Sequence, residues 1–398
     1  MKFSTLIMNS NVFKRLRSFI LFKYFLNRFN NDFSVLLDIN SFNCANQELK
    51  RRSSYKIAFI IPGMEALNGG HTSILRLGTY LSELGHEIYY IPYENQEKKE
   101  MELNAKTNLF NYKGVFLEKN DIVKLNFDIG IATSWLSGYH LLAHQNNFDY
   151  KMYFVQDFEP YFFPVSDYYY LSLNTYKFGF HMVSLGKWNK DQIEDITSRD
   201  VDYIDFPVEI NKYKLHNRAI KIDNEIKIAV YLKTDEKRAP FILLEQMKYL
   251  QEKMKDLGYT VILNVFGLDK LIKIPYINNL GKLKDYELVD LYQNSHFGLV
   301  ASLTNISLVN YEMILSGLPV IDFIDGSAPT FFTEEEMIFI KSEIGDLFNK
   351  VHYYVNHQKE LNELFNRAQN KIINEKTSWK KSAQQFNEIL IKAQNILQ

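Results

Sequence analysis

Apolar residues along this chain gather in short continuous runs that alternate with helical patterns. The first run, Lys56–Pro62, is typical of a parallel strand covered on both faces. A loop follows it, and then a helical repeat that stops at Gly85, a residue suited to the left-handed end of a helix. These units predict one doubly wound α/β domain. Its further strands are predicted at Glu87–Ile91, Phe127–Ser134, Lys151–Gln156, His181–Ser184 and Val201–Phe206.

The alternation lapses into polar, mixed sequence between Pro207 and Glu225 and then restarts. Buried strands are predicted at Ile226–Leu232, Thr260–Phe266, Phe297–Ala301 and Leu318–Phe323, with helices at Phe241–Lys255, Asp285–Gln293 and Leu308–Ser316. The fold class is therefore α/β, with two Rossmann-like domains that face each other across a cleft. The predicted parts are an N-terminal extension (1–54), a first domain (55–206), a linker (207–225), a second domain (226–375) and a C-terminal helix (376–398), for which packing back on the first domain is one option.

Length and composition agree with two globular domains. The chain has 398 residues, of which 46% are apolar and 23% charged, and its formal net charge of -1 gives no reason to expect nucleic acid as a partner. Cys44 is the single cysteine, so the chain has no internal disulfide and no cysteine-based zinc site. A reducing compartment, the cytoplasm, is the expected location.

The N-terminal extension is basic and rich in aromatic residues. No acidic residue precedes Asp32. We predict a basic amphipathic helix over residues 2–28 that contacts a membrane surface at the inner face of the cytoplasmic membrane. The alternative is a helix packed on the domain with its aromatic residues inward. No apolar run reaches the roughly 18 residues that a spanning helix needs. The basic residues are Lys2, Lys14, Arg15, Arg17, Lys23 and Arg28.

Candidate chemistry in the first domain follows two predicted strands. Gly69, Gly70 and His71 form a turn before a helix N-terminus, where glycines permit close approach and the helix dipole favours an anion. The turn lacks the full GxGxxG spacing, and glycine for turn geometry alone is the alternative. Asp157 and Glu159 end a later strand amid aromatic sequence, where a carboxylate can act as a general base toward a hydroxyl. A strand-end cap and a solvated glutamate are the alternatives.

Candidate chemistry in the second domain consists of cations and one carboxylate. Lys233 and Arg238 follow its first strand, where they can neutralise a departing diphosphate, whereas Lys237 is interpreted as solvated. Glu312 lies on a short helix that Gly317 ends, and a carboxylate there can accept both hydroxyls of a ribose. No paired carboxylates of the DxD type stand in a metal-like setting, so we expect no metal ion.

The block from Glu312 to Ile321 resembles the donor-nucleotide motif of the large retaining glycosyltransferase group with the GT-B fold usually called family 4. Together with Gln156–Pro160 and the preceding Ser134-Trp135, it resembles the bacterial rhamnosyltransferase branch of that group. The resemblance runs from about Lys56 to the C-terminal helices. It implies retaining, metal-independent transfer of rhamnose from dTDP-rhamnose to a saccharide or lipid-linked saccharide in bacterial surface polysaccharide synthesis, without a cofactor.

The resemblance also implies roles for residues, position by position. Glu312 would bind the ribose, and Lys233 and Arg238 the diphosphate. Asp157 and Glu159 would be catalytic. The motif of this family often contains two glutamates, the first lying eight residues before the second. Glu312 matches the second, but Thr304 stands at the position of the first. A role for an acidic group of that loop against the sugar is therefore in doubt. The other donor-binding residues would be Gly69, Gly70, Gly281, Leu283, Ser302, Thr304, Asn305 and Ser307, and those near the acceptor or sugar His71, Trp135, Tyr139 and Gln156.

Three other functions fit parts of this pattern. A nucleotide-sugar 2-epimerase would share the layout and the nucleotide site. A non-catalytic glycan-binding scaffold would keep the fold without needing the cations and Glu312. A dinucleotide-dependent oxidoreductase is disfavoured because the full glycine fingerprint is absent.

Overall fold

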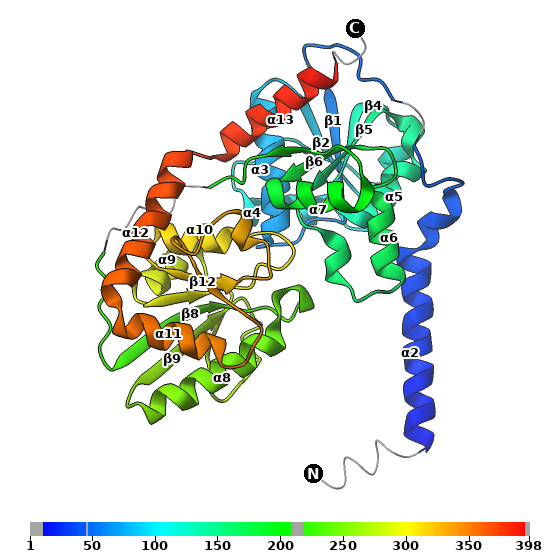
Figure 1. The fold of residues 1–398 in the computed structure, drawn as a ribbon. Coiled ribbons are helices and arrows are strands. Elements are labelled where there is room, and N and C mark those ends of the chain that lie inside the picture. Colours follow the sequence, from blue (N-terminus) through cyan, green and yellow to red (C-terminus); the bar gives the residue numbers. More distant parts are fainter. Residues whose placement is uncertain (1–10, 45–46, 209, 211–217, 395–398) are drawn as a thin grey trace.

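The computed structural model describes residues 11–44, 47–208, 210 and 218–394, and it contains two α/β domains (Figure 1). The first domain holds a parallel seven-stranded sheet in the order β3-β2-β1-β4-β5-β6-β7. The chain runs from the inner strand β1 through β2 to the edge strand β3, and then crosses to β4 on the other side of β1. The strands are β1 (Lys56–Ile61), β2 (Glu87–Pro92), β3 (Val115–Phe116), β4 (Phe127–Ala132), β5 (Phe148–Val155), β6 (His181–Leu185) and β7 (Asp202–Ile204).

Helices cover both faces of this sheet, which is why its strands are continuous apolar runs. Residues 57–61 of β1, for example, are fully buried. The helices are α3 (Gly69–Glu83), α4 (Lys98–Asn108), α5 (Trp135–Ala143), α6 (Asp167–Thr175) and α7 (Lys187–Thr197), with short 3-10 turns η1 (Ser34–Asp38), η2 (Lys119–Val123), η3 (Gln145–Asn147) and η4 (Glu159–Phe162).

The second domain repeats this plan with a parallel six-stranded sheet in the order β10-β9-β8-β11-β12-β13. Its strands are β8 (Glu225–Tyr231), β9 (Thr260–Phe266), β10 (Asn278–Gly281), β11 (Phe297–Leu299), β12 (Val320–Phe323) and β13 (Ile338–Ile340). Its helices are α8 (Pro240–Asp256), α9 (Asp285–Gln293), α10 (Leu308–Leu315), α11 (Asp346–Asn356) and α12 (Gln358–Glu375), with turns η5 (Glu236–Arg238) and η6 (Ala328–Thr330). The prediction of two Rossmann-like domains is confirmed.

Part of the segment predicted as a linker packs on the second domain. Ile220 and Ile222 are buried in its core, and the Arg218 guanidinium donates to the backbone oxygens of Gly317, Gln293 and Ser295. Residues 209 and 211–217 lie outside the described residues. Residues 218–224 thus belong to the second domain and lead into β8.

The last described helix, α13 (Trp379–Ala393), returns to the first domain and lies on α3 (Figure 1). The Phe386 ring is buried and meets Phe154 of β5 edge-on, with ring centroids 6.4 Å apart. His86 and Asn387 are hydrogen bonded at 3.0 Å. The first domain therefore includes a helix encoded after the second domain.

The N-terminal helix α2 (Asn11–Asp32) projects away from both domains (Figure 1). Phe19, Phe22 and Tyr24 are each more than half exposed, so the alternative of a helix with aromatic residues packed inward is wrong for this stretch. Exposed apolar residues occupy the consecutive positions 19–22, so in this stretch they point to all sides of the helix. Residues 2–10 of the predicted helix lie outside the described residues.

Truncation of Phe386 tests whether α13 packs into the core of the first domain. Phe386→Ala should lower the free energy of unfolding by about 3 kcal/mol or more, because it leaves a cavity between α13 and the first domain. Urea unfolding measures this change. Ile391→Ala, at a 48% exposed position of the same helix, is the matched control and should change it by less than about 0.5 kcal/mol. Equal effects of the two variants would show that α13 is not part of the core.

Candidate active site

The two domains meet where a turn after β5 contacts a loop after β11. We call residues 156–159 the β5 turn and residues 302–307 the β11 loop. The Phe158 backbone N–H donates to the Thr304 backbone oxygen at 2.9 Å. The Asn305 side-chain amide donates to the backbone oxygens of Gln156 at 2.6 Å and Leu185 at 3.0 Å. Because the carboxyl ends of parallel strands carry the ligand sites of such sheets, this contact lies where a shared site is expected.

Asp157 is the charged centre of this contact. One of its carboxylate oxygens accepts from the Thr304 hydroxyl at 2.9 Å, and the other is 3.3 Å from the Lys237 ammonium. That ammonium also lies 3.8 Å from the centroid of the Phe162 ring. Lys237 was interpreted as a solvated loop residue, and the structure corrects this, since its side chain reaches the first domain. The position of the doubtful family glutamate, Thr304, thus faces a carboxylate from the other domain.

Glu159 is buried, whereas a general base must be able to reach the acceptor hydroxyl. It is 8% exposed, its carboxylate accepts from the Tyr153 hydroxyl, and its backbone N–H donates to the Tyr176 hydroxyl at 3.2 Å. Burial raises the pKa of Glu159 to about 8, so the carboxyl carries its proton at neutral pH. The prediction of a catalytic Glu159 is therefore corrected to a buried, protonated hydrogen-bonding group.

A second buried carboxyl, Asp322 of β12, holds the β11 loop in shape. Asp322 is fully buried and accepts from the backbone N–H groups of Ser302 at 2.9 Å and Phe323 at 2.7 Å, and from the Asn310 amide at 2.7 Å. Desolvation raises its pKa above the ordinary range. Neither Asp322 nor Asn310 was singled out in the sequence. The available signal was an aspartate inside an otherwise apolar strand, LPVIDF, which requires buried partners.

Ser302 belongs to the interior of this loop. It is fully buried, its hydroxyl accepts from the Ser307 backbone N–H at 3.2 Å, and its backbone oxygen accepts from Ser327. Direct binding of phosphate or sugar by the Ser302 side chain, as predicted, conflicts with this burial. The role that the geometry supports is to position the loop.

Two cations lie at the carboxyl end of β8, next to the β11 loop. Arg238 donates through Nη1 to the Ala301 backbone oxygen at 2.8 Å, and its Cζ lies 5.6 Å from the centroid of the Tyr231 ring. The Lys233 ammonium lies 5.8 Å from the same centroid. Among the described residues, no partner lies within hydrogen-bonding range of the buried Arg238 Nε. Both predicted cations thus lie close to one tyrosine at the carboxyl end of β8.

Helix α10 presents its N-terminus at the same edge. The Ser307 hydroxyl caps it by accepting from the Val309 N–H at 3.3 Å, and Glu312 is half-buried one turn further on. Gly298 of β11 lets the helix approach the sheet closely, because a Cβ there would collide with Met313. A helix N-terminus near two cations favours an anion at this edge.

The first domain contributes the turn before α3. Gly69 faces open space, since a Cβ there would meet no atom within 4 Å, so packing within the described protein does not explain this glycine. A Cβ on Gly70 would lie 3.8 Å from the Gln156 side-chain oxygen, which places this turn beside the β5 turn. His71 is buried and its Nδ1 accepts from the Glu65 N–H at 2.9 Å. Burial lowers the pKa of His71, so its imidazole is neutral at pH 7.

The two predicted aromatic sugar contacts lie in a cluster of rings. Tyr139 is fully buried, and its hydroxyl donates to the Leu171 backbone oxygen at 3.0 Å. It is a core residue, which corrects its assignment to an acceptor or sugar. Trp135 is half-buried and packs edge-on against Phe163 and Tyr168, with centroids 6.1 and 6.0 Å away.

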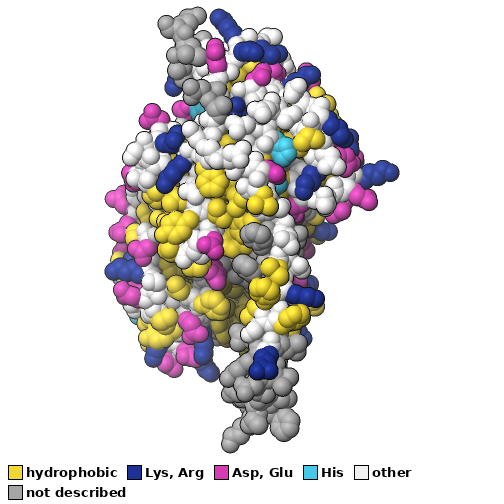
Figure 2. Space-filling view, turned by 90° about the vertical axis from the view of Figure 1, so that its right-hand side faces the viewer, with side chains coloured by type: hydrophobic (Ala, Val, Ile, Leu, Met, Phe, Trp, Pro, Cys, Tyr) yellow, Lys and Arg dark blue, Asp and Glu magenta, His cyan; other side chains and the backbone are white. Residues whose placement is uncertain are grey.

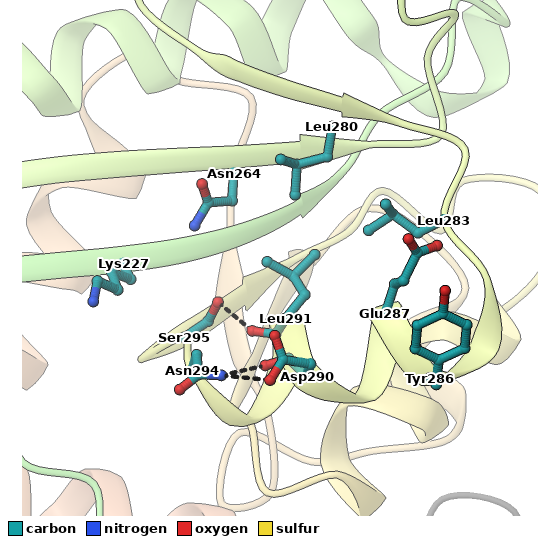
Figure 3. Close-up of a pocket in the computed structure, with 10 residues that line it drawn as sticks. All are labelled: Lys227, Asn264, Leu280, Leu283, Tyr286, Glu287, Asp290, Leu291, Asn294 and Ser295. Carbon is teal, nitrogen blue, oxygen red and sulfur yellow. Dashed lines mark hydrogen bonds between the residues drawn. The ribbon is translucent and has the colours of Figure 1, made fainter.

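A cavity of about 610 Å³ lies between β8, β9, β10 and α9 (Figure 3). Leu283 is the one predicted site residue among those lining it. Gly281, just before it, has a φ of +77°, which glycine adopts without strain. The cavity runs along α9, apart from the β5 turn. It is lined by Lys227, Asn264, Leu280, Leu283, Tyr286, Glu287, Asp290, Leu291, Asn294 and Ser295.

Within the part of the chain that the structure describes, no group of three or more His, Cys, Asp or Glu side chains is arranged to hold a metal ion. Metal independence itself stays a prediction.

Two facing doubly wound sheets with their carboxyl edges in contact define the GT-B fold, and the comparisons agree with it. Residues 244–388, in the second domain and the C-terminal helices, match the family model described as glycosyl transferase-like. This stretch of the chain is therefore similar to glycosyl transferase-like domains. No curated protein matches the chain.

Solved structures with the same fold cover most of the chain. HepE of Anabaena in complex with UDP-glucose has a TM-score of 0.66 at 12% identity, covering 85% of this chain and 100% of that one. Sucrose-phosphate synthase of Thermosynechococcus elongatus has a TM-score of 0.62 at 13% identity, with 86% and 99% covered. A glycosyltransferase of Rickettsia africae has a TM-score of 0.60 at 14% identity, with 87% and 100% covered. These similarities show the fold.

The variant Glu159→Gln tests whether the buried Glu159 carboxyl makes the stability of the protein depend on pH. The folded pKa of about 8 lies above the unfolded value near 4.5, so between these values the folded state keeps a proton that the unfolded state releases. Wild-type stability should therefore fall as pH rises through this window. The variant should lack this loss and gain about 1.4 kcal/mol per pH unit relative to the wild type from pH 5 to 8, measured by urea unfolding. Parallel curves would contradict the assignment.

Proposed function

We propose that this protein is a GT-B glycosyltransferase that moves a sugar from a nucleotide-sugar to a saccharide or lipid-linked saccharide acceptor. The observation that carries the proposal is the gathering of Lys233, Arg238 and the α10 N-terminus at the edge of the second sheet that contacts the first domain. This arrangement suits a diphosphate, because fixed positive charge and N–H dipoles favour the leaving group as its charge develops. The family match over residues 244–388 supports the same class.

In the proposed reaction, the bond from the anomeric carbon to the diphosphate oxygen breaks and a bond to an acceptor oxygen forms. Arg238 and Lys233 bind the diphosphate, and Glu312 accepts the ribose hydroxyls. The acceptor hydroxyl loses a proton, and Asp157 is the remaining candidate base now that Glu159 is assigned as protonated. Asp157 is held by Lys237 in this structure, and a bound diphosphate would compete for that cation.

We further propose a retaining, metal-independent reaction with dTDP-rhamnose as donor, in the cytoplasm, during bacterial surface polysaccharide synthesis. These points rest on the resemblance of the motifs in 156–160 and 312–321. A UDP-sugar is the second candidate donor, because the HepE structures contain UDP-glucose or UDP.

Removal of Arg238 or Glu312 should abolish transfer without unfolding the protein. Arg238→Ala removes a charge that stabilises the leaving diphosphate, and Glu312→Ala removes the ribose acceptor, so each should lower kcat/KM by about 100-fold or more. Product formation with dTDP-rhamnose and UDP-sugars, on a rhamnose- or hexose-terminated acceptor, measures this effect. Thermal unfolding checks the fold.

Lys255→Ala and Glu252→Ala, at exposed positions of α8, are the matched charge controls and should keep wild-type turnover. Wild-type turnover in Arg238→Ala or Glu312→Ala would refute the site assignment. Donor hydrolysis or epimerisation without an acceptor would favour a nucleotide-sugar epimerase. Tight glycan binding without product from any donor would favour a scaffold.

A further inference from the structure

Helix α2 exposes apolar side chains at four consecutive positions. Phe19, Ile20, Leu21 and Phe22 are 54–58% exposed, and Tyr24 is 62% exposed. Successive residues of an α-helix are rotated by about 100°, so four in a row point to all sides of its axis. These side chains therefore surround the helix. Figure 2 shows apolar side chains on this helix and on the neighbouring surface of the first domain.

A helix that is apolar on all sides is normally surrounded by other apolar groups. The body of this protein does not surround α2. Just beyond the helix, the Phe33 ring lies 5.1 Å from Tyr168 and 6.4 Å from Trp135, and these contacts join the chain to the first domain. A flat protein surface would cover one side of α2 and leave the other sides in water. The occupant that fits is a medium able to enclose the helix.

The charge of the same segment selects the kind of medium. All 47 acidic residues of the chain lie after residue 31, whereas six basic residues lie before it. The Lys23 ammonium is 5.5 Å from the Phe19 ring centroid, so at least one of these charges sits among the exposed apolar residues. A second copy of α2 would bring like charges together. An anionic surface complements them.

We propose that α2 docks the protein on an anionic lipid membrane. The exposed side chains of residues 19–22 enter the boundary between headgroups and acyl chains, while the Lys23 ammonium extends to lipid phosphates. None of the helices in the described residues has the length and apolar character needed to cross a bilayer. Through Phe33, this docking holds the first domain beside the membrane.

This placement adds a location to the proposed function. The consequence for the acceptor, given next, rests on that proposed function. A lipid-linked acceptor would lie at the same surface as the first domain, which is the proposed acceptor domain. The docking itself requires neither donor nor acceptor.

The test is flotation of the full chain with vesicles of phosphatidylcholine alone and of phosphatidylcholine with 30% phosphatidylglycerol. We expect binding to the anionic vesicles. Phe19→Ser/Phe22→Ser should weaken it by at least about tenfold, because two buried aromatic groups are lost. Lys23→Gln should weaken it by about fivefold. The control is Phe241→Ser/Leu271→Ser, which changes two residues that are 76% and 86% exposed on the second domain and should leave binding unchanged.

No binding of the wild-type chain, or equal binding to both kinds of vesicle, would overturn the proposal. So would an α2-dependent dimer, seen by light scattering, in a protein that ignores vesicles. Because the assay contains no nucleotide-sugar, its failure leaves the proposed reaction untouched. Conversely, an Arg238→Ala variant without transferase activity should still bind the anionic vesicles as the wild type does.

Discussion

A fully buried carboxyl group, Asp322, is the constraint on which the contact between the two domains depends. A group of this kind is costly to bury unless its oxygens are hydrogen bonded, and Asp322 meets that requirement with two backbone N–H groups and the Asn310 amide. Those bonds join β12 to the start of the β11 loop and to α10. The loop is thereby held in the shape that places Thr304 and Asn305 against the first domain. Hydrogen bonds inside the second domain thus determine how its β11 loop contacts the first domain.

The domain contact combines a polar part with an apolar part. In the polar part, Asp157 accepts a hydrogen bond from Thr304 and forms an ion pair with Lys237. An incoming anion would disturb both of these interactions. In the apolar part, the Phe206 ring stacks on Tyr311 with centroids 5.6 Å apart and also meets Phe331. The apolar part does not depend on charge. The contact can therefore exchange its ionic partners while the ring packing continues to join the domains.

The sequence was sufficient for the architecture because helix-covered parallel strands leave continuous apolar runs, as in Lys56–Pro62. The edge strands β3, β10 and β13 were missed. Residues 115–116 and 278–281 contain no apolar run of strand length, unlike the strands that were predicted. At the site, strand ends located the β5 turn and the β11 loop, but they could not show side-chain direction. Glu159 and Tyr139 point into the core. Lys237 reaches Asp157 of the first domain, a residue far away in the chain.

The return of α13 to the first domain has a consequence for the order in which the protein is made. The face of α3 against which α13 packs, and the β5 ring that meets Phe386, stay uncovered until residues 379–393 have been synthesised. The second domain has all of its strands by Ile340. During translation the domain begun first is therefore the one completed last, and an apolar surface on a nascent chain is a surface open to chaperones and to aggregation.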